Sequence, residues 1–384
     1  MELDNGAISE LLAREAENAN ETLRRAYKRA ARAAFLWPAE ARTLFEAGES
    51  LTTLAGIGPY LERQLKNWIE SPPKDTEPPA IRRNFLTLSR ARRILSRQPD
   101  WPTAYRGDLQ MHSRWSDGSA TIRQMAKAGQ ERGYEYIAIT DHSQGLKIAG
   151  GISPDELCQQ AREIQRMNEQ FNKAGSFRVL RSIELNLNPQ GQGDMENECL
   201  DELDLVVGSF HSRLREKEDQ TARYLAALAN RHVTILGHPV GRIYNHRLGL
   251  PADWTRVCAR AAQLDKALEI DSYPDRQDLS TELLKIARAE GTRIAIDTDA
   301  HSPEQLGFVE LGLAAALEVG IARERIVNFM AATDLLAWAA ELKAATTGGT
   351  LPQMFSRRRS LKHRTPLHAK PRSQRRAELP GRQI

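Results

Sequence analysis

The chain has 384 residues, of which 41% are hydrophobic and 27% charged, and its formal net charge is +4. This composition predicts a globular protein with a packed core, and no apolar run approaches the ~20 residues needed to span a bilayer, which argues against a membrane protein. The three cysteines, Cys158, Cys199 and Cys258, lie far apart and argue against a disulfide framework. The acidic N-terminal segment lacks the pattern of a secretory signal, so we expect a cytoplasmic protein.

Residues 1–71 have the pattern of a small all-α domain. Gly56-Ile57-Gly58 indicates a tight turn between two helices, and Pro59 suits the first turn of the second helix. Glycines at such a turn let backbone N–H groups approach a phosphate at a helix N-terminus. Apolar residues recur three or four positions apart, at Leu12, Ala16, Ala19, Leu23, Tyr27, Ala30 and Ala34.

Two segments of biased composition flank the rest of the chain. Residues 72–103 begin with prolines and continue with six arginines and no acid between positions 80 and 98, which predicts a linker followed by a basic helix. Residues 346–384 predict a disordered basic tail, since 351–384 carry ten Lys or Arg against one Glu. Such a tail suits a polyanionic partner, but a solvated terminus without a partner fits equally well.

Between residues 104 and 345, short apolar strands alternate with helical stretches. This alternation predicts parallel strands joined by crossover helices. We count seven such strands, one of them Ala267-Leu268-Glu269-Ile270-Asp271. Seven βα units predict an α/β fold built on a closed or nearly closed barrel. In such barrels the chemistry lies at the carboxyl ends of the strands.

Residues of the type that bind metals occupy these carboxyl ends. A single histidine after an apolar run is more often an ordinary hydrogen-bonded residue, and His232, His246, His363 and His368 are assigned to that class. The joint pattern instead favours a metal site, because His and carboxylate ligands together suit Zn, Mn or Fe. Several such cations close together are typical of enzymes that cleave phosphate esters. The candidate ligands are His112, His142, Glu184, His211, His238, Asp299 and His301 at strand ends, and Asp117 in a turn that can return to the barrel mouth.

The motifs that carry these residues resemble, in order, those of the PHP (polymerase and histidinol phosphatase) superfamily. The similar segments are Asp108-Leu109-Gln110-Met111-His112, Ser116-Asp117-Gly118, Thr140-Asp141-His142-Ser143, Ser209-Phe210-His211-Ser212, Gly237-His238-Pro239 and Thr298-Asp299-Ala300-His301-Ser302. The resemblance implies a distorted (β/α)7 barrel that holds two to three divalent cations (Mn, Zn or Fe) and hydrolyses phosphoesters. It implies the following metal ligands: His112, Asp117, His142, Glu184, His211, His238, Asp299 and His301.

One position departs from the family pattern. Many members have His-x-His in the first motif, whereas Gln110 precedes His112 here. An amide oxygen is a weak ligand that suits a harder cation such as Mn. Glutamine at this place resembles the PHP domains attached to bacterial family X DNA polymerases.

The helical region resembles the small helix-hairpin-helix domain at the start of those polymerases. The resemblance implies DNA-phosphate contacts at Gly56, Ile57, Gly58 and Tyr60, and a purely structural helical domain is the alternative. Gln64 stands where lyase members of the family have a reactive lysine, so we expect no lyase activity. About 30 residues between the hairpin and the barrel leave no room for a polymerase core, so we expect no polymerase activity.

The sequence therefore predicts a metal-dependent phosphoesterase that acts on DNA 3′ ends, as a 3′–5′ exonuclease or an end-processing enzyme in DNA repair. It would bind the DNA backbone without base readout. His238 is a candidate third-metal ligand or leaving-group stabiliser, and Arg242 and Arg276 are candidate phosphate clamps, with ordinary ion pairs as the alternative. A phosphatase of a small phosphorylated metabolite is the second hypothesis. A non-catalytic DNA-binding scaffold is the third.

Overall fold

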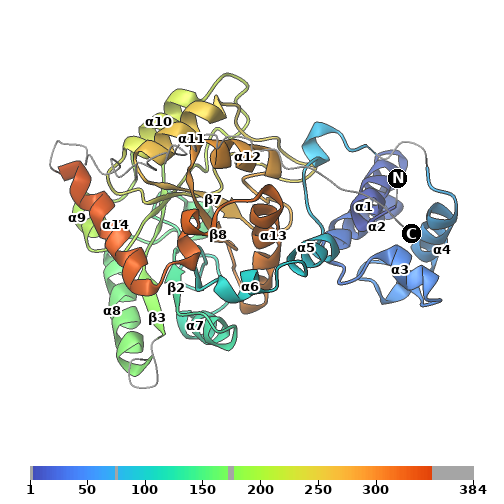
Figure 1. The fold of residues 1–384 in the computed structure, drawn as a ribbon, viewed down its shortest axis with the longest axis horizontal. Coiled ribbons are helices and arrows are strands. Elements are labelled where there is room, and N and C mark those ends of the chain that lie inside the picture. The colour runs from blue at the N-terminus through green and yellow to red at the C-terminus, as the bar shows by residue number, and fades with distance from the viewer. Residues whose placement is uncertain (1–2, 74–76, 172–176, 348–384) are drawn as a thin grey trace, which may run out of the picture.

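The computed structural model describes residues 3–73, 77–171 and 177–347, which form a small helical unit and a larger α/β part (Figure 1). The helical unit contains α1 (Asn5–Asn18), α2 (Glu21–Ala33), α3 (Ala41–Glu46) and α4 (Pro59–Glu70). Two 3-10 turns, η1 (Ala34–Leu36) and η2 (Leu51–Thr53), lie between these helices. The expected all-α character of this region agrees with these elements.

Capping side chains set where the first helices begin. Asp4 accepts a hydrogen bond from the N–H of Ala7 (2.9 Å), and Asn20 accepts one from the N–H of Leu23 (3.1 Å). These bonds satisfy N–H groups that have no acceptor within the helix. The apolar faces of the helices meet in a core of their own, which includes Ile8, Leu12, Trp37, Leu51 and Leu65.

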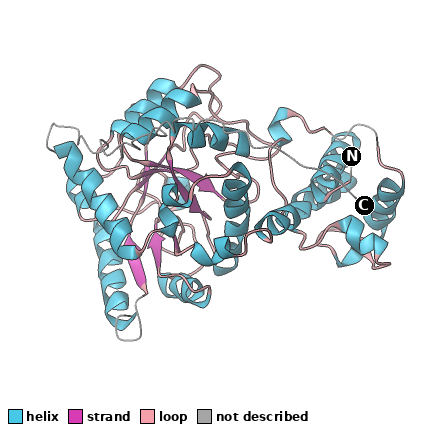
Figure 2. Ribbon diagram, viewed as in Figure 1, coloured by secondary structure: helices cyan, strands magenta, loops and turns pink. Residues whose placement is uncertain are grey.

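The α/β part contains two sheets in which every neighbouring pair of strands is parallel (Figure 2). The first sheet has the order β1 (Gly107–Asp108), β2 (Tyr136–Ile139), β3 (Arg178–Arg181). The second has the order β4 (Glu184–Asn186), β5 (Val207–Ser209), β6 (Ile235–Leu236), β7 (Ala267–Asp271), β8 (Arg293–Asp297). Isolated parallel bridges, His142 to Glu184 and Met111 to Ala300, connect the two sheets.

The strands differ from the sequence-based expectation in number and in length. One predicted strand is interrupted at Ser182 and Ile183, so β3 and β4 belong to different sheets. β1 is two residues long because side chains replace the ladder beyond it. The N–H of Leu109 donates to Asp297 Oδ1 (2.7 Å), and the N–H of Met111 donates to Thr140 Oγ1 (3.0 Å). The candidate ligands therefore lie just past the regular strands.

Helices cover the sheets and close one end of them. The covering helices are α7 (Ile122–Glu131), α8 (Pro154–Phe171), α9 (Asn197–Asp201), α10 (Thr221–Ala229), α11 (Trp254–Gln263), α12 (Thr281–Glu290) and α13 (Val309–Val319). The last helix, α14 (Ala332–Thr347), packs Leu335 and Trp338 against a buried apolar cluster that includes strand residues. Trp338 Nε1 donates to the carbonyl of Asp265 (2.9 Å), just before β7. Thus α14 lies at the amino ends of the strands and leaves the carboxyl ends for the ligands.

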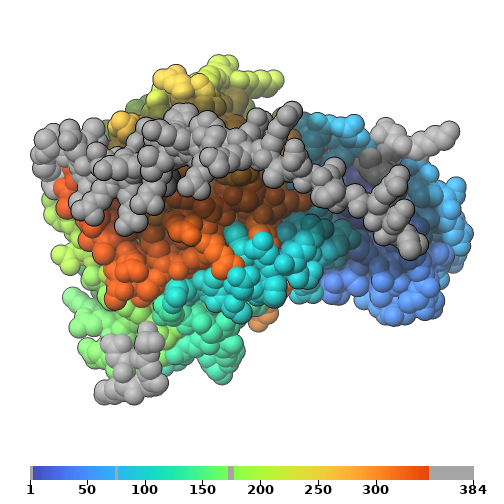
Figure 3. All heavy atoms as spheres, viewed as in Figure 1, coloured from blue at the N-terminus to red at the C-terminus, as the bar shows by residue number. Residues whose placement is uncertain are grey.

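The segment after the helical unit is packed into the protein and is no free linker. It forms α5 (Leu88–Leu95) and α6 (Asp100–Ala104), and Figure 3 shows this teal segment between the blue helices and the orange C-terminal region. Ala91 and Ile94 belong to the main apolar core. The arginines of this basic helix contact acids: Arg90 with Glu318 at 2.7 Å and Arg92 with Glu310 at 2.8 Å. The structure thus gives Arg90 and Arg92 acidic partners within the protein.

A long loop after β6, the β6–α11 loop (residues 237–253), carries the contact between the helical unit and the α/β part. The ring of Tyr244 packs edge-on against Phe35 of η1, with centroids 4.8 Å apart, and its hydroxyl lies 3.2 Å from Ser9 Oγ of α1. Arg82, just before α5, donates to Asn245 (3.0 Å) and makes two hydrogen bonds to Glu10 (2.7 and 2.9 Å). Glu10 and Arg82 are both buried. The helical unit is therefore held against the loop that begins next to His238.

Residues 348–384, on which most of the expected basic tail falls, lie outside the described residues. Within the described part of the chain, every helix is too short or too polar to cross a membrane.

Candidate metal centre

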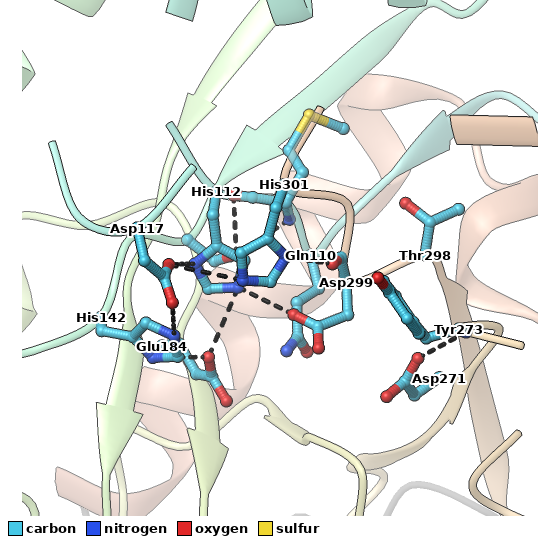
Figure 4. A network of polar contacts seen from close by, with 12 residues as sticks. Gln110, His112, Asp117, His142, Glu184, Asp271, Tyr273, Thr298, Asp299 and His301 are labelled. Carbon is cyan, nitrogen blue, oxygen red and sulfur yellow. Dashed lines mark hydrogen bonds and ion pairs between the residues drawn. The ribbon is translucent and has the colours of Figure 1, made fainter. Parts of the chain in front are cut away.

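The candidate ligands lie together beyond the carboxyl ends of the strands: Figure 4 shows His112, Asp117, His142, Glu184, Asp299 and His301, and both His211 and His238 contact Glu184. Parallel strands end at the same edge, so the residues that follow them face a common space. The turn after His112 brings Asp117 back toward the histidines, and the N–H of Gly118 donates to the carbonyl of Ser113 (2.9 Å). A Cβ on Gly118 would lie 2.6 Å from the carbonyl carbon of His112, so this turn requires glycine.

Glu184 is the fully buried centre of the cluster. Its Oε1 lies 2.8 Å from His238 Nε2 and 3.1 Å from His211 Nε2. Its Oε2 lies 2.9 Å from His142 Nδ1 and 3.5 Å from His112 Nε2. Burial raises the pKa of a carboxyl group, but the charges of His142 and His211 bring the pKa of Glu184 well below its usual value. A carboxylate with histidines around both oxygens is suited to bridge two cations.

A second group of ligands surrounds His112. Its Nε2 lies 2.8 Å from Asp299 Oδ1, and the rings of His142 and His301 both stack on it with centroids 4.4 Å away. Asp117 faces all three rings, at 3.4 Å from His301 Nε2, 3.6 Å from His142 Nε2 and 3.8 Å from His112 Nδ1. Protonated imidazoles packed this closely would repel one another, so the carboxylates supply the charge that makes the packing possible.

The carboxylates also control the protonation of the histidines. Burial lowers the pKa of His142, but Glu184 and Asp117 outweigh it and raise the pKa to about 10. Burial also lowers the pKa of His301, but Asp117 outweighs it and raises the pKa to about 9. His211 differs, because burial lowers its pKa. A metal ligand must be a neutral imidazole, so cations compete here with protons and their affinity should rise with pH.

The residues fit bound divalent cations. Three overlapping sets of side chains place one ligand atom each within 4.8 Å of one another: His112, Asp117, His142 and His301; His142, Glu184 and His211; and His112, Glu184 and Asp299. Buried atoms in these sets make no hydrogen bond of ordinary geometry, namely Nδ1 of His112, Nδ1 of His142 and Oε2 of Glu184, although the last two lie 2.9 Å apart. His238 joins the cluster through Glu184. Buried ligand atoms without a well-formed hydrogen bond are costly unless a cation binds them.

The side chain of Gln110 is hydrogen-bonded to Glu269, a buried acid that was not among the predicted site residues. With its amide in the orientation that satisfies its neighbours, the Gln110 nitrogen donates to Glu269 of β7 at 2.5 and 3.2 Å. The N–H of His238 donates to the same carboxyl group (2.5 Å). Burial, followed by the charges of Asp297 and Asp271, raises the pKa of Glu269 well above its usual value. Glu269 thus positions both Gln110 and the backbone of a candidate ligand.

Further buried acids lie next to the cluster. In the sequence they stand out as carboxylates within otherwise apolar strands. Asp108 of β1 accepts from Thr298 Oγ1 (2.6 Å), and burial raises its pKa to about 7. Asp297 of β8 accepts from Asn328 Nδ2 (2.8 Å). Both are fully buried. Strand alternation turns these side chains inward, so Ile296-Asp297 and Leu268-Glu269 could have been recognised as a second layer of the site.

The two candidate clamps have different surroundings. Arg276 lies beside the cluster, 3.5 Å from Asp299 Oδ2 and 3.6 Å from Asp271 Oδ2, with 28% of its side chain exposed. Arg242 instead stacks on Phe85, 3.7 Å from the ring centroid, and donates to the carbonyl of Arg83 (2.9 Å). The Arg242 guanidinium therefore packs against the segment before α5, whereas Arg276 lies beside the candidate ligands.

The hairpin residues are separated by their burial. Gly56 has a φ of +82°, which favours glycine, and a Cβ there would meet Cα of Ala30 at 3.3 Å. Gly58 precedes α4 and has open space around it, and Tyr60 is 49% exposed. Ile57 is 6% exposed and belongs to the core of the helical unit. The side chain of Ile57 is therefore part of that core, and only its backbone is left for contacts outside the helical unit.

An α/β scaffold whose strand ends carry overlapping His and carboxylate sets defines a metal-dependent hydrolase of the phosphoesterase class. The family model described as "PHP domain" matches residues 108–298, and the chain therefore contains a PHP domain.

Curated relatives of two kinds align with this chain. "DNA polymerase/3'-5' exonuclease PolX" of Bacillus subtilis (strain 168) is 39% identical over 234 residues, which cover 61% of this chain and 40% of the relative. The chain thus spans less than half the length of that protein. "Probable phosphatase" of Syntrophotalea carbinolica is 26% identical over 247 residues, which cover 59% of this chain and 93% of the relative.

A solved structure of histidinol phosphate phosphatase from Lactococcus lactis subsp. lactis Il1403 covers 63% of this chain and 94% of its own, with 16% identity and a TM-score of 0.38. This likeness is too low to inform the site.

Proposed function

We propose that this protein is a metal-dependent phosphoesterase that hydrolyses phosphoester bonds at DNA 3′ ends, as a 3′–5′ exonuclease or end-processing enzyme without polymerase activity. The identity to the Bacillus subtilis PolX, at 39%, exceeds the 26% identity to the Syntrophotalea phosphatase, and only the first of these names includes a nuclease. DNA would be bound through its backbone, without base readout.

The proposal rests chiefly on where the helical unit is attached. The β6–α11 loop contains His238 near one end and Tyr244 further along, and Tyr244 packs on η1 and α1. The N–H of Asn245 in the same loop donates to the carbonyl of Ile81 (3.1 Å). An added unit fixed to the rim of a metal site extends the surface that a long substrate can contact. A small metabolite would not need this surface.

The finer architecture belongs to the same proposal. Counting β3 and β4 as one interrupted strand leaves seven strand positions, and this count, with the bridges between the sheets, supports a distorted (β/α)7 barrel. We assign residues 104–345 to this PHP barrel, residues 1–71 to a helix-hairpin-helix domain, residues 72–103 to the connection and residues 346–384 to a basic tail. In the hairpin, the backbone at Gly56, Ile57 and Gly58 and the exposed Tyr60 would face a DNA phosphate at the N-terminus of α4.

The candidate ligands would hold two to three cations of Mn, Zn or Fe. When bound, such cations polarise a phosphoryl oxygen and make water a stronger nucleophile near neutral pH. Glu184 would bridge, His112, Asp117, His142, His211, Asp299 and His301 would complete the sets, and His238 would contribute through its contact with Glu184. Arg276 would approach a phosphate oxygen from the exposed side, held in place by Asp299 and Asp271. Glu269 would hold the Gln110 side chain in its orientation beside the candidate ligands through their hydrogen bonds.

A phosphatase of a small phosphorylated metabolite remains a second candidate, favoured by one observation. The alignment covers 93% of the Syntrophotalea phosphatase, so a chain with little beyond the barrel region bears that name. The ligand chemistry would be the same for either substrate.

One assay in Mn²⁺ separates the two candidates. The protein is incubated with 3′-recessed, single-stranded and abasic DNA, and separately with histidinol phosphate. Turnover of DNA that a His142→Ala/His211→Ala variant loses, and that a His232→Gln variant keeps, supports the proposal. His232 is the matched control because it pairs with Asp201 (3.0 Å), outside the ligand sets. Turnover of histidinol phosphate alone establishes the second candidate. DNA turnover that survives in the double variant identifies a contaminant and overturns the proposal.

A further inference from the structure

Cationic side chains line a hollow beside the metal ligand His211. Arg213 and Arg215 come from the segment after β5, and Arg247 comes from the β6–α11 loop. The hollow has a volume of about 380 Å³. This lies within the range of ~300–1,000 Å³ that is usual for ligand clefts. Three arginines and one acid, Glu216, line it, which suits an anionic ligand better than an apolar one.

A second hollow, of about 490 Å³, lies between the helical unit and the same loop. Its other wall is formed by Tyr244, Asn245 and His246. Four exposed cations of α2 line it, at positions i, i+3, i+4 and i+7, which lie on one face of a helix: Arg25, Lys28, Arg29 and Arg32.

The two hollows are neighbours. Arg247 lines the first, the adjacent His246 lines the second, and Arg215 Nη2 of the first lies 3.0 Å from His246 Nε2. We name the combined surface the cationic trough: Arg213, Arg215, His246 and Arg247 on the α/β part, and Arg25, Lys28, Arg29 and Arg32 on α2. It leads from His211 to the helical unit.

The charges of the trough are poorly compensated. Arg25 pairs with Glu21 (2.9 Å) and Arg213 with Glu216 (2.7 Å). Among the described residues, no carboxylate lies within ion-pair distance of the other cations of the trough: Lys28, Arg29, Arg32, Arg215 and Arg247. Burial, and then the charges of Arg276 and Arg215, lower the pKa of Arg247, so the cations repel one another.

The contrast with α5 shows that this arrangement is not general. The arginines of α5 also lie between the two parts of the protein, yet they pair with Glu310 and Glu318. Arg90 and Arg92 therefore have acidic partners, whereas most of the cations in the trough do not. Uncompensated cations aligned with a reactive site attract a polyanion.

We propose that the cationic trough holds the sugar-phosphate backbone of a DNA single strand whose 3′ end enters the metal centre beside His211. The inference rests on the proposed function and adds the path of the substrate. A single strand fits better than a duplex because the ligands at the bottom, His112 and Glu184, are fully buried, so the chain end must descend between loops. Lys and Arg contacts to phosphate carry no base preference, so recognition is independent of sequence.

The test removes three charges from α2 with the variant Lys28→Ala/Arg29→Ala/Arg32→Ala. The matched control, Lys127→Ala/Arg162→Ala/Arg166→Ala, removes three exposed charges from α7 and α8, which lie away from the helical unit (Figure 1). A fluorescent single-stranded 20-nucleotide DNA is titrated by anisotropy in EDTA across a range of NaCl concentrations. Hydrolysis of the same DNA and of a small chromogenic phosphodiester is then measured in Mn²⁺.

The trough variant should bind the DNA at least about tenfold more weakly, and the slope of log K against log salt should fall by roughly 2, since each lost phosphate contact on a single strand contributes ~0.7. Its KM for DNA should rise with kcat little changed, and the chromogenic substrate should be turned over as in wild type. Equal binding and equal slope in the trough and control variants overturn the trough while DNA hydrolysis by the wild type still supports the proposed function.

Further outcomes refute the inference in different ways. Absence of DNA hydrolysis by the wild type, with turnover of histidinol phosphate, overturns the proposed function itself. Tighter binding of a 20-nucleotide RNA than of DNA overturns DNA as the occupant. A Lys28→Arg/Arg29→Lys/Arg32→Lys variant keeps the charges and should restore binding to within about twofold. Failure to do so shows that the helix face acts through packing rather than charge.

Discussion

Replacing Arg82 by Met should weaken the attachment of the helical unit to the β6–α11 loop. Arg82 makes two hydrogen bonds to Glu10, one to Glu17 (2.7 Å) and one to Asn245, and it is 8% exposed. Removing one partner of a buried pair leaves an uncompensated charge and costs ~3–5 kcal/mol. Arg14 still donates to Glu10 (2.7 Å), so we expect a loss of about 3 kcal/mol, at the lower end.

Calorimetry measures this loss. With an unfolding entropy of ~2.1 cal/mol/K per residue, a chain of 384 residues that unfolds cooperatively should lose roughly 4 °C in Tm. Arg83→Met is the control, because Arg83 is exposed and pairs with the exposed Glu77 (3.1 Å), an arrangement that contributes ~0–1 kcal/mol. The double variant Arg82→Met/Glu10→Leu should recover most of the loss, since both buried charges are then gone. The reasoning fails if Arg82→Met costs no more than Arg83→Met.

Three further predictions concern single residues. Gly58→Glu should weaken DNA binding about tenfold, because a carboxylate there would occupy the anion position at the N-terminus of α4. Open space surrounds Gly58, so Tm should not fall. Unchanged anisotropy titrations would exclude the hairpin as a DNA contact. Arg276→Ala should lower kcat for a chromogenic phosphodiester by roughly 10² while Arg242→Ala has little effect, and equal losses in steady-state assays would contradict the assignment. Lys266 is buried, and burial lowers its pKa to about 7. Above that pH the unfolded state binds more protons than the folded state, so the free energy of unfolding should rise by roughly 2 kcal/mol between pH 7 and 9 because of this group. Lys266→Met should abolish that gain in urea titrations, and a pH dependence equal to that of wild type would refute it.

The ligand cluster was accessible to sequence reasoning because strand ends of a parallel α/β fold converge by geometry. His142 and His211 needed only this rule, and Asp117 needed only the glycine turn behind it. The docking of Tyr244 on Ser9 joins residues 235 positions apart and has no local pattern. The direction of Arg242 depended on the same docking, since its partner Phe85 precedes α5.

The length of the predicted strands was overestimated for a physical reason. A segment such as Leu109-Gln110-Met111 is readily predicted as a strand, but its composition does not show whether a backbone N–H donates to a carbonyl or to a side chain. Here Asp297 and Thr140 replace the ladder acceptors. The substitution allows the chain to leave the sheet where the ligands begin.

The β6–α11 loop also has a thermodynamic consequence. His238 at its start belongs to the ligand cluster, and Tyr244 and Asn245 fasten it to the helical unit. If bound cations order this loop, they also strengthen the attachment of the helical unit, and by linkage the attachment strengthens cation binding by the same free energy. A chelator and a substitution at Arg82 should therefore shift the same equilibrium, the ordering of the β6–α11 loop. The chelator would act near His238 and the substitution near Asn245.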